Sequence, residues 1–222
     1  MGRYAESLRQ VPVFRGLDAR ALEELEGRLI PRQFGKDAML VRQGDEGDAL
    51  HVVVSGRAKA VLAGEGGRDL TLHIFGPGEF FGEMALIDDE PRSATVVALC
   101  ETTTLVLSRA AFLEHLRVFP ETAMAMLRQL VARLRNADEV IGSLAHMDVH
   151  GRVLRVLRDL AEREEQGAGT YIRLTNRPTH QELASMIGTS RETVSRTLTE
   201  MARRGEVELE GRSLALRADL LA

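Results

Sequence analysis

The stretch THQELASMIGTSRETVSRTLTEMARR, residues 179–204, predicts two short helices joined by a tight turn. Thr179, followed three residues later by Glu182, is a capping-box pattern that opens the first helix. Gly188 suits the turn because glycine tolerates positive φ, and Ser190 can cap the second helix. This order of cap, helix, glycine, cap and helix is that of a helix-turn-helix.

The second predicted helix begins with charged side chains of the kind that read DNA bases. Arginine donates a bidentate pair to guanine O6 and N7, and glutamate accepts from cytosine N4. Arg191, Glu192 and Arg196 therefore form a candidate base-reading face. The alternative is a solvated charged face with an internal Glu–Arg pair. The short polar residues near the two helix N-termini suit phosphate oxygens and are Thr179, Gln181, Ser190 and Thr193.

Two further patterns surround this motif. Asp148 is an N-cap candidate for an amphipathic helix over residues 149–160, and residues 171–174 have β character. After Gly205, which closes the second helix, the segments 206–210 and 213–217 flank Gly211. These two segments predict a β-hairpin, which would be the wing of a winged helix-turn-helix.

Before these helices, the sequence has a pattern typical of β-strands. Between residues 33 and 108, short β-rich runs alternate with glycines. The runs are residues 38–41, 50–55, 57–63, 70–75, 93–98 and 103–108. Their regular spacing indicates a small antiparallel barrel or roll. Asp18 is an N-cap candidate for a helix over residues 18–29, just before the roll.

A long helix is predicted from Pro120, which suits a first helical turn, to about His146. Its apolar residues recur at alternating steps of four and three and are Leu127, Val131, Leu134, Ile141 and Ala145, with Asp138 in the same row. That spacing is typical of a coiled-coil seam, so we expect a parallel homodimer. The alternative is that the stripe packs on the roll.

The segment from residue 76 to 95, GPGEFFGEMALIDDEPRSAT, predicts a phosphate cradle. Gly82 lets the backbone approach a ligand, and a short helix starting near Ala85 can turn its N–H groups toward an anion. Arg92 and Ser93 supply a guanidinium fork and a hydroxyl. Glu83 would repel a phosphate but can accept from a sugar hydroxyl, which together indicate a nucleotide. The alternative is a turn in which Glu83 and Arg92 pair with each other.

These motifs carry a family resemblance. FGEMAL followed by PRSAT resembles the phosphate-binding cassette of the cAMP receptor protein/FNR family of bacterial transcription regulators. SRETVSRTL resembles the recognition helix of that family, and MDVHGRVLRVL resembles its hinge and following helix. The likeness extends from about residue 10 to 217. It implies an α+β protein with a cyclic-nucleotide-binding β-roll (residues 1–119), a dimerisation helix and hinge (120–147) and a winged helix-turn-helix (148–222).

Residue by residue, the resemblance implies that Glu83 binds the ribose hydroxyl and that Arg92 and Ser93 bind the cyclic phosphate. The full set of candidate nucleotide residues is Gly82, Glu83, Met84, Ala85, Arg92, Ser93 and Asp138. The chain has Ala137 and Asp138 where cAMP-responsive members often place Thr-Ser against the adenine. A carboxylate there can accept from the adenine amino group, and cAMP is the expected ligand. Guanine could also donate to this carboxylate, which leaves cGMP open.

Composition bears on the cofactors, the location and the partner of the protein. The only cysteine, Cys100, cannot supply a disulfide framework or an iron–sulfur cluster, and we expect no metal and no haem. No apolar run is long enough to span a membrane and no signal peptide is evident, so the expected location is the cytoplasm. Residues 149–222 carry a net charge of +1 against −5 for the rest, which places a polyanion partner at the C-terminal third.

The leading hypothesis is a cAMP-responsive regulator that binds double-stranded DNA at palindromic, TGTGA-like half-sites and activates transcription through contact with RNA polymerase. A family member with a vestigial cassette that binds DNA without a ligand is the nearest alternative. A signalling module resembling kinase regulatory subunits would lack the helix-turn-helix. A nucleotide hydrolase would need a metal cluster or a nucleophile–base pair, which the sequence does not indicate, so we expect no enzyme.

Overall fold

The computed structural model describes residues 4–64, 69–162, 170–174, 177–210 and 213–221. The chain divides into two compact units, which are described separately below. One comprises residues 1–63 and 71–135, and the other comprises residues 64–70 and 136–222.

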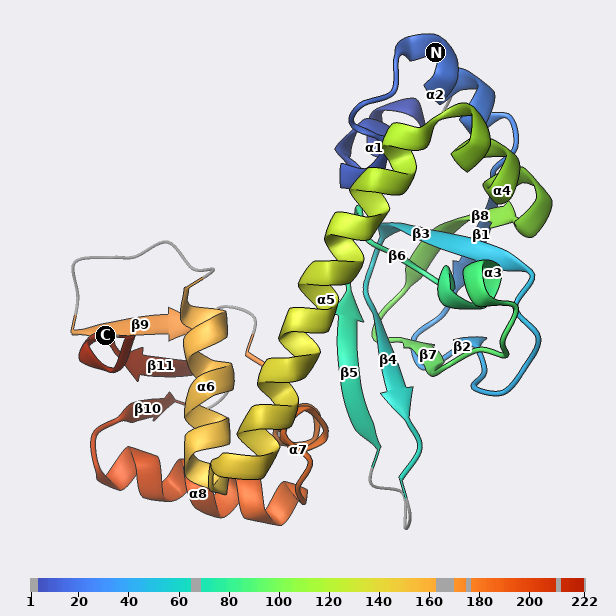
Figure 1. Cartoon of the computed structure of the whole chain (residues 1–222). Helices are drawn as coiled ribbons and strands as arrows, with labels where there is room; N and C mark the ends of the chain where they lie inside the picture. Colours follow the sequence, from blue (N-terminus) through green and yellow to red (C-terminus); the bar gives the residue numbers. More distant parts are fainter. Residues whose placement is uncertain (1–3, 65–68, 163–169, 175–176, 211–212, 222) are drawn as a thin grey trace. The chain divides into compact units, whose positions relative to one another are not determined.

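The first unit contains two four-stranded antiparallel sheets that face each other (Figure 1). The first sheet has the order β1 (Ile30–Phe34), β8 (Thr102–Ser108), β3 (Ala49–Ser55), β6 (Phe80–Phe81). The second has the order β2 (Met39–Val41), β7 (Thr95–Ala98), β4 (Ala58–Leu62), β5 (Leu70–Phe75). The shared core takes side chains from both, namely Val53, Ala58, Ala60, Phe75, Phe81 and Val96. The predicted antiparallel roll is therefore confirmed.

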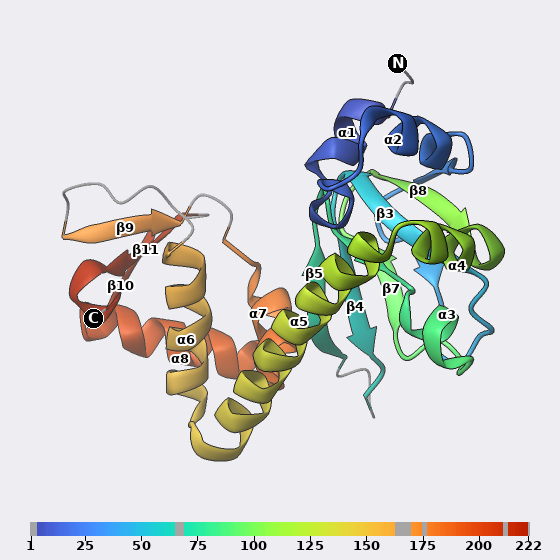
Figure 2. The same cartoon turned by 45° about the horizontal axis from the view of Figure 1, so that its top comes forward.

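Helices cover one end of this roll (Figures 1 and 2). They are α1 (Ala5–Gln10), the 3₁₀ turn η1 (Pro12–Phe14), α2 (Ala19–Glu26) and α4 (Arg109–Val118). Their apolar side chains join those of β3, β6 and β8 in a second core, whose largest fully buried members include Phe14, Phe80 and Phe112. Asp18 caps α2 as predicted, because its carboxylate accepts from the Ala21 N–H at 2.8 Å. One more short helix, α3 (Met84–Asp88), follows β6.

The long helix α5 (Pro120–His146) has the predicted bounds. Thr122 and Met126 are buried on one face of it. The predicted seam residues lie on a different, exposed face, where the side chains of Leu127, Val131, Leu134 and Ile141 are each about half exposed or more. The alternative in which this stripe packs on the roll is therefore wrong, and the stripe needs another partner to cover it.

The second unit is a small helical domain with a three-stranded sheet (Figure 2). Its helices are α6 (Val149–Ala161), α7 (His180–Ile187) and α8 (Arg191–Arg203), and η3 (Ala218–Leu221) follows the last strand. Its strands have the order β10 (Val207–Glu210), β11 (Ser213–Arg217), β9 (Tyr171–Leu174). Antiparallel pairing of β10 with β11 confirms the predicted hairpin, whereas Gly211 lies outside the described residues. Asp148 caps α6 by accepting from the Gly151 N–H at 2.8 Å, also as predicted.

No helix in the described part of the chain is long and apolar enough to cross a membrane.

Candidate functional site

The predicted cradle centres on Gly82, between β6 and α3. Its φ is +87°, and a Cβ placed on it would lie 2.3 Å from Nη1 of Arg92. Only glycine fits both the conformation and the space. A second close approach, which the sequence analysis missed, is at Gly47, where a Cβ would lie 2.4 Å from that of Ala85.

Arg92 is buried and fixed in place. Its Nη1 donates to the Gly82 carbonyl and its Nη2 to the Ala49 carbonyl, each at 2.8 Å. Burial lowers the pKa of the guanidinium, and the carboxylates of Asp48 and Glu83 oppose that shift. A buried cation held by neutral carbonyls is well suited to attract an anion.

Glu83 does not pair with Arg92, so the alternative weighed from the sequence is wrong. Its Oε1 accepts from Nη1 of Arg133 on α5 at 3.1 Å. The other oxygen, Oε2, is buried and has no hydrogen-bond partner among the described residues. Burial raises the pKa of this carboxyl, while the charges of Arg133 and Arg92 act in the opposite direction. A buried acceptor without a donor needs a partner, and a ligand hydroxyl can supply one.

Arg133 is the functional candidate that the sequence analysis missed. Its Nη2 donates to the Phe80 carbonyl at 2.6 Å, and the guanidinium lies 4.6 Å from the centre of the Phe80 ring. These contacts fix the cation beside Glu83. Residue 133 follows the buried Met126 by seven positions and therefore lies on the same face of the helix, but the fold sets that burial and the sequence alone carries no signal of it.

The remaining predicted nucleotide residues have different surroundings. Ala85 is buried at the start of α3, as expected of a cradle helix. Met84 and Ser93 are exposed, and the Ser93 hydroxyl lies 3.5 Å from Sδ of Met84. Asp138 is exposed and belongs to the second compact unit, so its role toward a nucleotide stays a prediction.

The residues of the first unit fit a cyclic nucleotide. An unpartnered carboxylate oxygen suits a sugar hydroxyl, and a buried guanidinium, for which Gly82 leaves room, suits a phosphate. No group of three or more metal-ligating side chains occurs in the residues that the structure describes.

His51 on β3 is a buried histidine beside Arg92. Its ring stacks on Phe81 at 4.8 Å, and its Nδ1 lies 3.3 Å from the Thr104 hydroxyl. Burial, with a smaller contribution from the charge of Arg92, lowers the pKa of His51 to about 4. The folded protein therefore keeps this ring neutral at pH values where the unfolded chain protonates it.

We expect this difference to make the fold sensitive to acid. A histidine whose pKa is lowered by folding contributes its full stability at pH values above its pKa in the unfolded chain, near 6.5. That stability is lost as the pH falls from 6.5 toward 4. The free energy of unfolding should decrease by about 2 kcal/mol between pH 7.5 and pH 5 on account of His51. Urea unfolding at the two pH values measures this, and His51→Phe should lose that part of the decrease. Equal pH dependence in both proteins would contradict the assignment.

The helix-turn-helix in the second unit matches its sequence pattern closely. Thr179 and Glu182 form the complete capping box, with N···O distances of 2.7 and 3.2 Å. Gly188 ends α7 with φ of +65°, and the Ser190 hydroxyl caps α8 by accepting from the Thr193 N–H at 3.2 Å. The buried face of α8 is fixed in the core by Val194, Leu198 and Met201.

The predicted base-reading side chains are on the outer face of α8. Arg191, Glu192 and Arg196 are all exposed, and no Glu192–Arg196 ion pair occurs in the described structure. The backbone N–H of Glu192, together with the Ser190 hydroxyl, lowers the pKa of the Glu192 carboxyl, which keeps it an acceptor. Thr179 and Gln181 are exposed at the beginning of α7.

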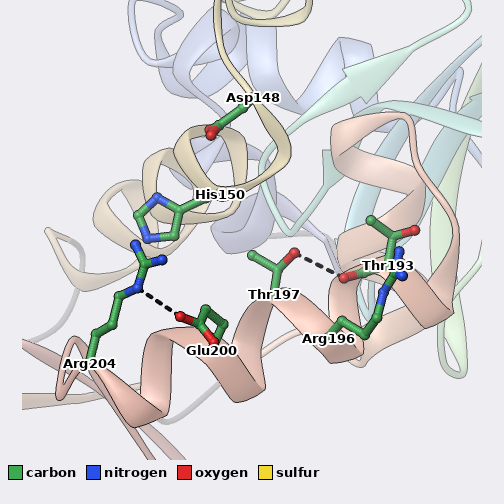
Figure 3. A pocket seen from close by; sticks show the side chains of 7 residues that line it. All are labelled: Asp148, His150, Thr193, Arg196, Thr197, Glu200 and Arg204. Atoms are coloured by element: carbon green, nitrogen blue, oxygen red, sulfur yellow. Dashed lines mark hydrogen bonds and ion pairs between the residues drawn. The ribbon is translucent and has the colours of Figure 1, made fainter.

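A pocket of about 360 Å³ lies between the beginning of α6 and the part of α8 that runs from Thr193 to its C-cap, Arg204 (Figure 3). Its lining residues are Asp148, His150, Thr193, Arg196, Thr197, Glu200 and Arg204. It brings together Thr193 and Arg196, which the sequence predicted, with His150, which it did not. His150 is held by Glu206, with 2.6 Å between Nε2 and Oε2, and Arg204 is held by Glu200 at 3.0 Å.

The chain matches two known domain families. Residues 31–118 match the cyclic nucleotide-binding domain, and residues 151–221 match the Crp-like helix-turn-helix domain.

Similar proteins extend over nearly the whole chain. A CRP-like cAMP-activated global transcriptional regulator of Mycobacterium tuberculosis is 33% identical over 211 residues, covering 95% of this chain and 94% of the relative. The cyclic AMP receptor protein of Thermus thermophilus is 39% identical over 202 residues, covering 89% and 88%. Among solved structures, the c-di-GMP responsive global regulator CLP of Xanthomonas campestris has a TM-score of 0.79 at 27% identity, covering 90% of this chain and 100% of that one.

Proposed function

Because the chain belongs to the cAMP receptor protein/FNR family of transcription regulators, we propose that it is a homodimer whose affinity for DNA is controlled by cAMP. The family consists of DNA-binding regulators with a cyclic nucleotide-binding domain, so the function is regulatory and not enzymatic. The proposed division is a nucleotide-binding roll over residues 1–119, a dimerisation helix and hinge over 120–147 and a DNA-binding domain over 148–222.

The observation that supports a nucleotide ligand most directly is the buried Oε2 of Glu83. A ribose 2′-hydroxyl would donate to this oxygen while Arg133 continues to occupy Oε1. The cyclic phosphate would lie against Arg92, Ser93 and the backbone N–H groups at Met84 and Ala85, over Gly82. In this arrangement Glu83 selects a ribose and Arg92 selects an anion, and a cyclic nucleotide supplies both groups.

Calorimetric titration with cAMP and with cGMP tests this proposal. We expect binding heat with cAMP, and in this proposal the adenine amino group donates to the carboxylate of Asp138. Heat with cGMP alone would keep the nucleotide site and change the base. Heat with neither would overturn the nucleotide-responsive function and favour a regulator that binds DNA without a ligand.

The DNA target follows from the exposed side chains of α8. Guanines would face Arg191 and Arg196, and a C·G pair would face Glu192, in TGTGA-like half-sites arranged as a palindrome. A dimer presents two α8 helices, one to each half-site. Once bound, the regulator would activate transcription by contacting RNA polymerase.

Arg191→Ala should reduce discrimination at one G·C position of the half-site by ~1–3 kcal/mol, because a bidentate contact to guanine is lost. A binding array that varies each base of the half-site measures the effect. Arg203→Ala is a matched control, since Arg203 is an exposed arginine at the other end of the same helix. Weaker binding to all sequences alike would make Arg191 a phosphate contact instead.

A further inference from the structure

The cradle helix α3 is too short to maintain its own conformation. It has five residues, and helices below about 12 residues are marginal in water even for favourable sequences. Its N-cap, Glu83, provides no side-chain cap. Within it, the N–H groups of Leu86 and Ile87 both donate to the Glu83 carbonyl at 3.1 Å. Contacts from outside the helix must therefore hold it in place.

The residue that ends α3, Asp89, has a backbone conformation that is unfavourable for a side chain other than glycine. Asp89 has φ of +63° and ψ of +15°, which is the left-handed region that favours glycine. Aspartate tolerates this region better than most residues but does not prefer it. The surrounding structure must supply an interaction that keeps Asp89 there.

That interaction comes from Arg109, the first residue of α4. Its Nη1 donates to the Ala85 carbonyl at 3.2 Å, and its Nη2 donates to Oδ1 of Asp89. One guanidinium thus binds both the first turn of α3 and the residue that ends the helix. The backbone N–H of Arg109 also donates to the Asp48 carbonyl at 2.7 Å.

The part of α3 that Arg109 holds is itself in contact with the cradle. Ala85, which Arg109 holds by its carbonyl, lies against Gly47, and a Cβ on Gly47 would also lie 3.1 Å from Nε of Arg92. A shift of α3 would therefore move Ala85 and its N–H relative to the buried guanidinium of Arg92. Arg109 also connects α3 to α4. Because α4 ends at Val118 and α5 begins at Pro120, α4 leads directly into the helix that carries the exposed seam.

We propose that Arg109 is a positioning residue for the nucleotide site, which holds α3 so that its first N–H groups and Arg92 face the same phosphate. The inference rests on the proposed function, because Arg109 contacts the cradle and not the ligand. It adds to that function a residue outside the cassette on which the affinity for the nucleotide depends.

The test compares Arg109→Ala with Arg28→Ala in the full-length protein. Arg28 is a matched control because its side chain is 33% exposed against 34% for Arg109, and it too pairs with a carboxylate, that of Glu114 on α4. It has no contact with α3 among those described. Hydrogen–deuterium exchange without ligand measures how firmly α3 is held, and calorimetric titration with cAMP measures the consequence.

We expect Arg109→Ala to accelerate exchange at the Leu86 and Ile87 amides and to weaken cAMP binding about tenfold, the loss of roughly one charge-assisted hydrogen bond. Arg28→Ala should change neither. Asp89→Asn should reproduce both effects, since asparagine accepts the left-handed conformation and lacks only the charge. This variant also serves if Arg109→Ala does not fold.

Each negative result has a distinct meaning. Unchanged exchange at Leu86 and Ile87 overturns the positioning role whatever the ligand. Faster exchange with unchanged affinity overturns it too, because α3 would then be free to move without consequence for binding. A wild-type protein that gives no heat with cAMP or cGMP overturns the proposed function, which the exchange experiment does not depend on.

Discussion

Arg92→Ala should lower the affinity for cAMP by roughly 100-fold or more while the β-roll stays folded. Arg92 is the buried cation that faces the proposed phosphate, and the loss of two charge-assisted hydrogen bonds to that phosphate would cost about 3 kcal/mol. Calorimetric titration measures the affinity, and circular dichroism checks the fold. Arg57→Ala replaces an exposed arginine of the same unit and should leave the affinity unchanged.

Two companion variants sharpen this result. Arg92→Lys keeps the charge without the fork and should fall between the wild type and Arg92→Ala. Glu83→Gln keeps the size of the side chain but removes the carboxylate. It should also weaken binding if Oε2 accepts from the ribose, whereas relief of simple repulsion would tighten it. Wild-type affinity in Arg92→Ala would mean that the phosphate does not bind at this cradle.

Leu134→Asp should convert the protein to a monomer and abolish specific DNA binding. Leu134 is 62% exposed at the middle of the apolar stripe of α5, and a charge there would have to be buried between two helices. Two half-sites require two recognition helices, so a monomer loses the second contact. Sedimentation velocity at micromolar concentration and a mobility-shift titration measure the two effects.

Val118→Asp is the matched control for this prediction. Val118 is 59% exposed, ends α4 and lies outside the stripe, so a charge there should leave the dimer and DNA binding intact. A wild-type protein that sediments as a monomer would contradict the homodimer itself. Dimers in Leu134→Asp would place the interface on another surface.

Local signals explain why the helix-turn-helix was predictable. The capping box at Thr179 and Glu182, the left-handed glycine at 188 and the cap at Ser190 each involve atoms within three residues of one another. Such patterns are written in consecutive residues and need no knowledge of the tertiary fold. The caps at Asp18 and Asp148 were predictable for the same reason.

The sequence failed to predict elements and site residues whose positions depend on contacts between distant parts of the chain or that lack a local pattern. The edge strand β1 contains Pro31 and is mostly exposed, so it lacks the apolar alternation by which strands are recognised. β6 has only two residues. In the cradle, the sequence indicated Glu83 and Arg92 but not that Arg133, 50 residues along the chain, would take one oxygen of Glu83. Gly47 was missed because only the fold brings it against Ala85.

The unpartnered oxygen of Glu83 also bears on how the ligand could be found. A buried acceptor without a donor is a thermodynamic penalty of the free protein, and a ligand that supplies the donor removes it. Binding to the folded state alone raises its stability by RT ln(1 + [L]/Kd), about 2.7 kcal/mol at a hundredfold excess over Kd. The melting temperature therefore becomes a reporter of occupancy. A thermal-shift screen of nucleotides would rank candidate signals before any promoter is known.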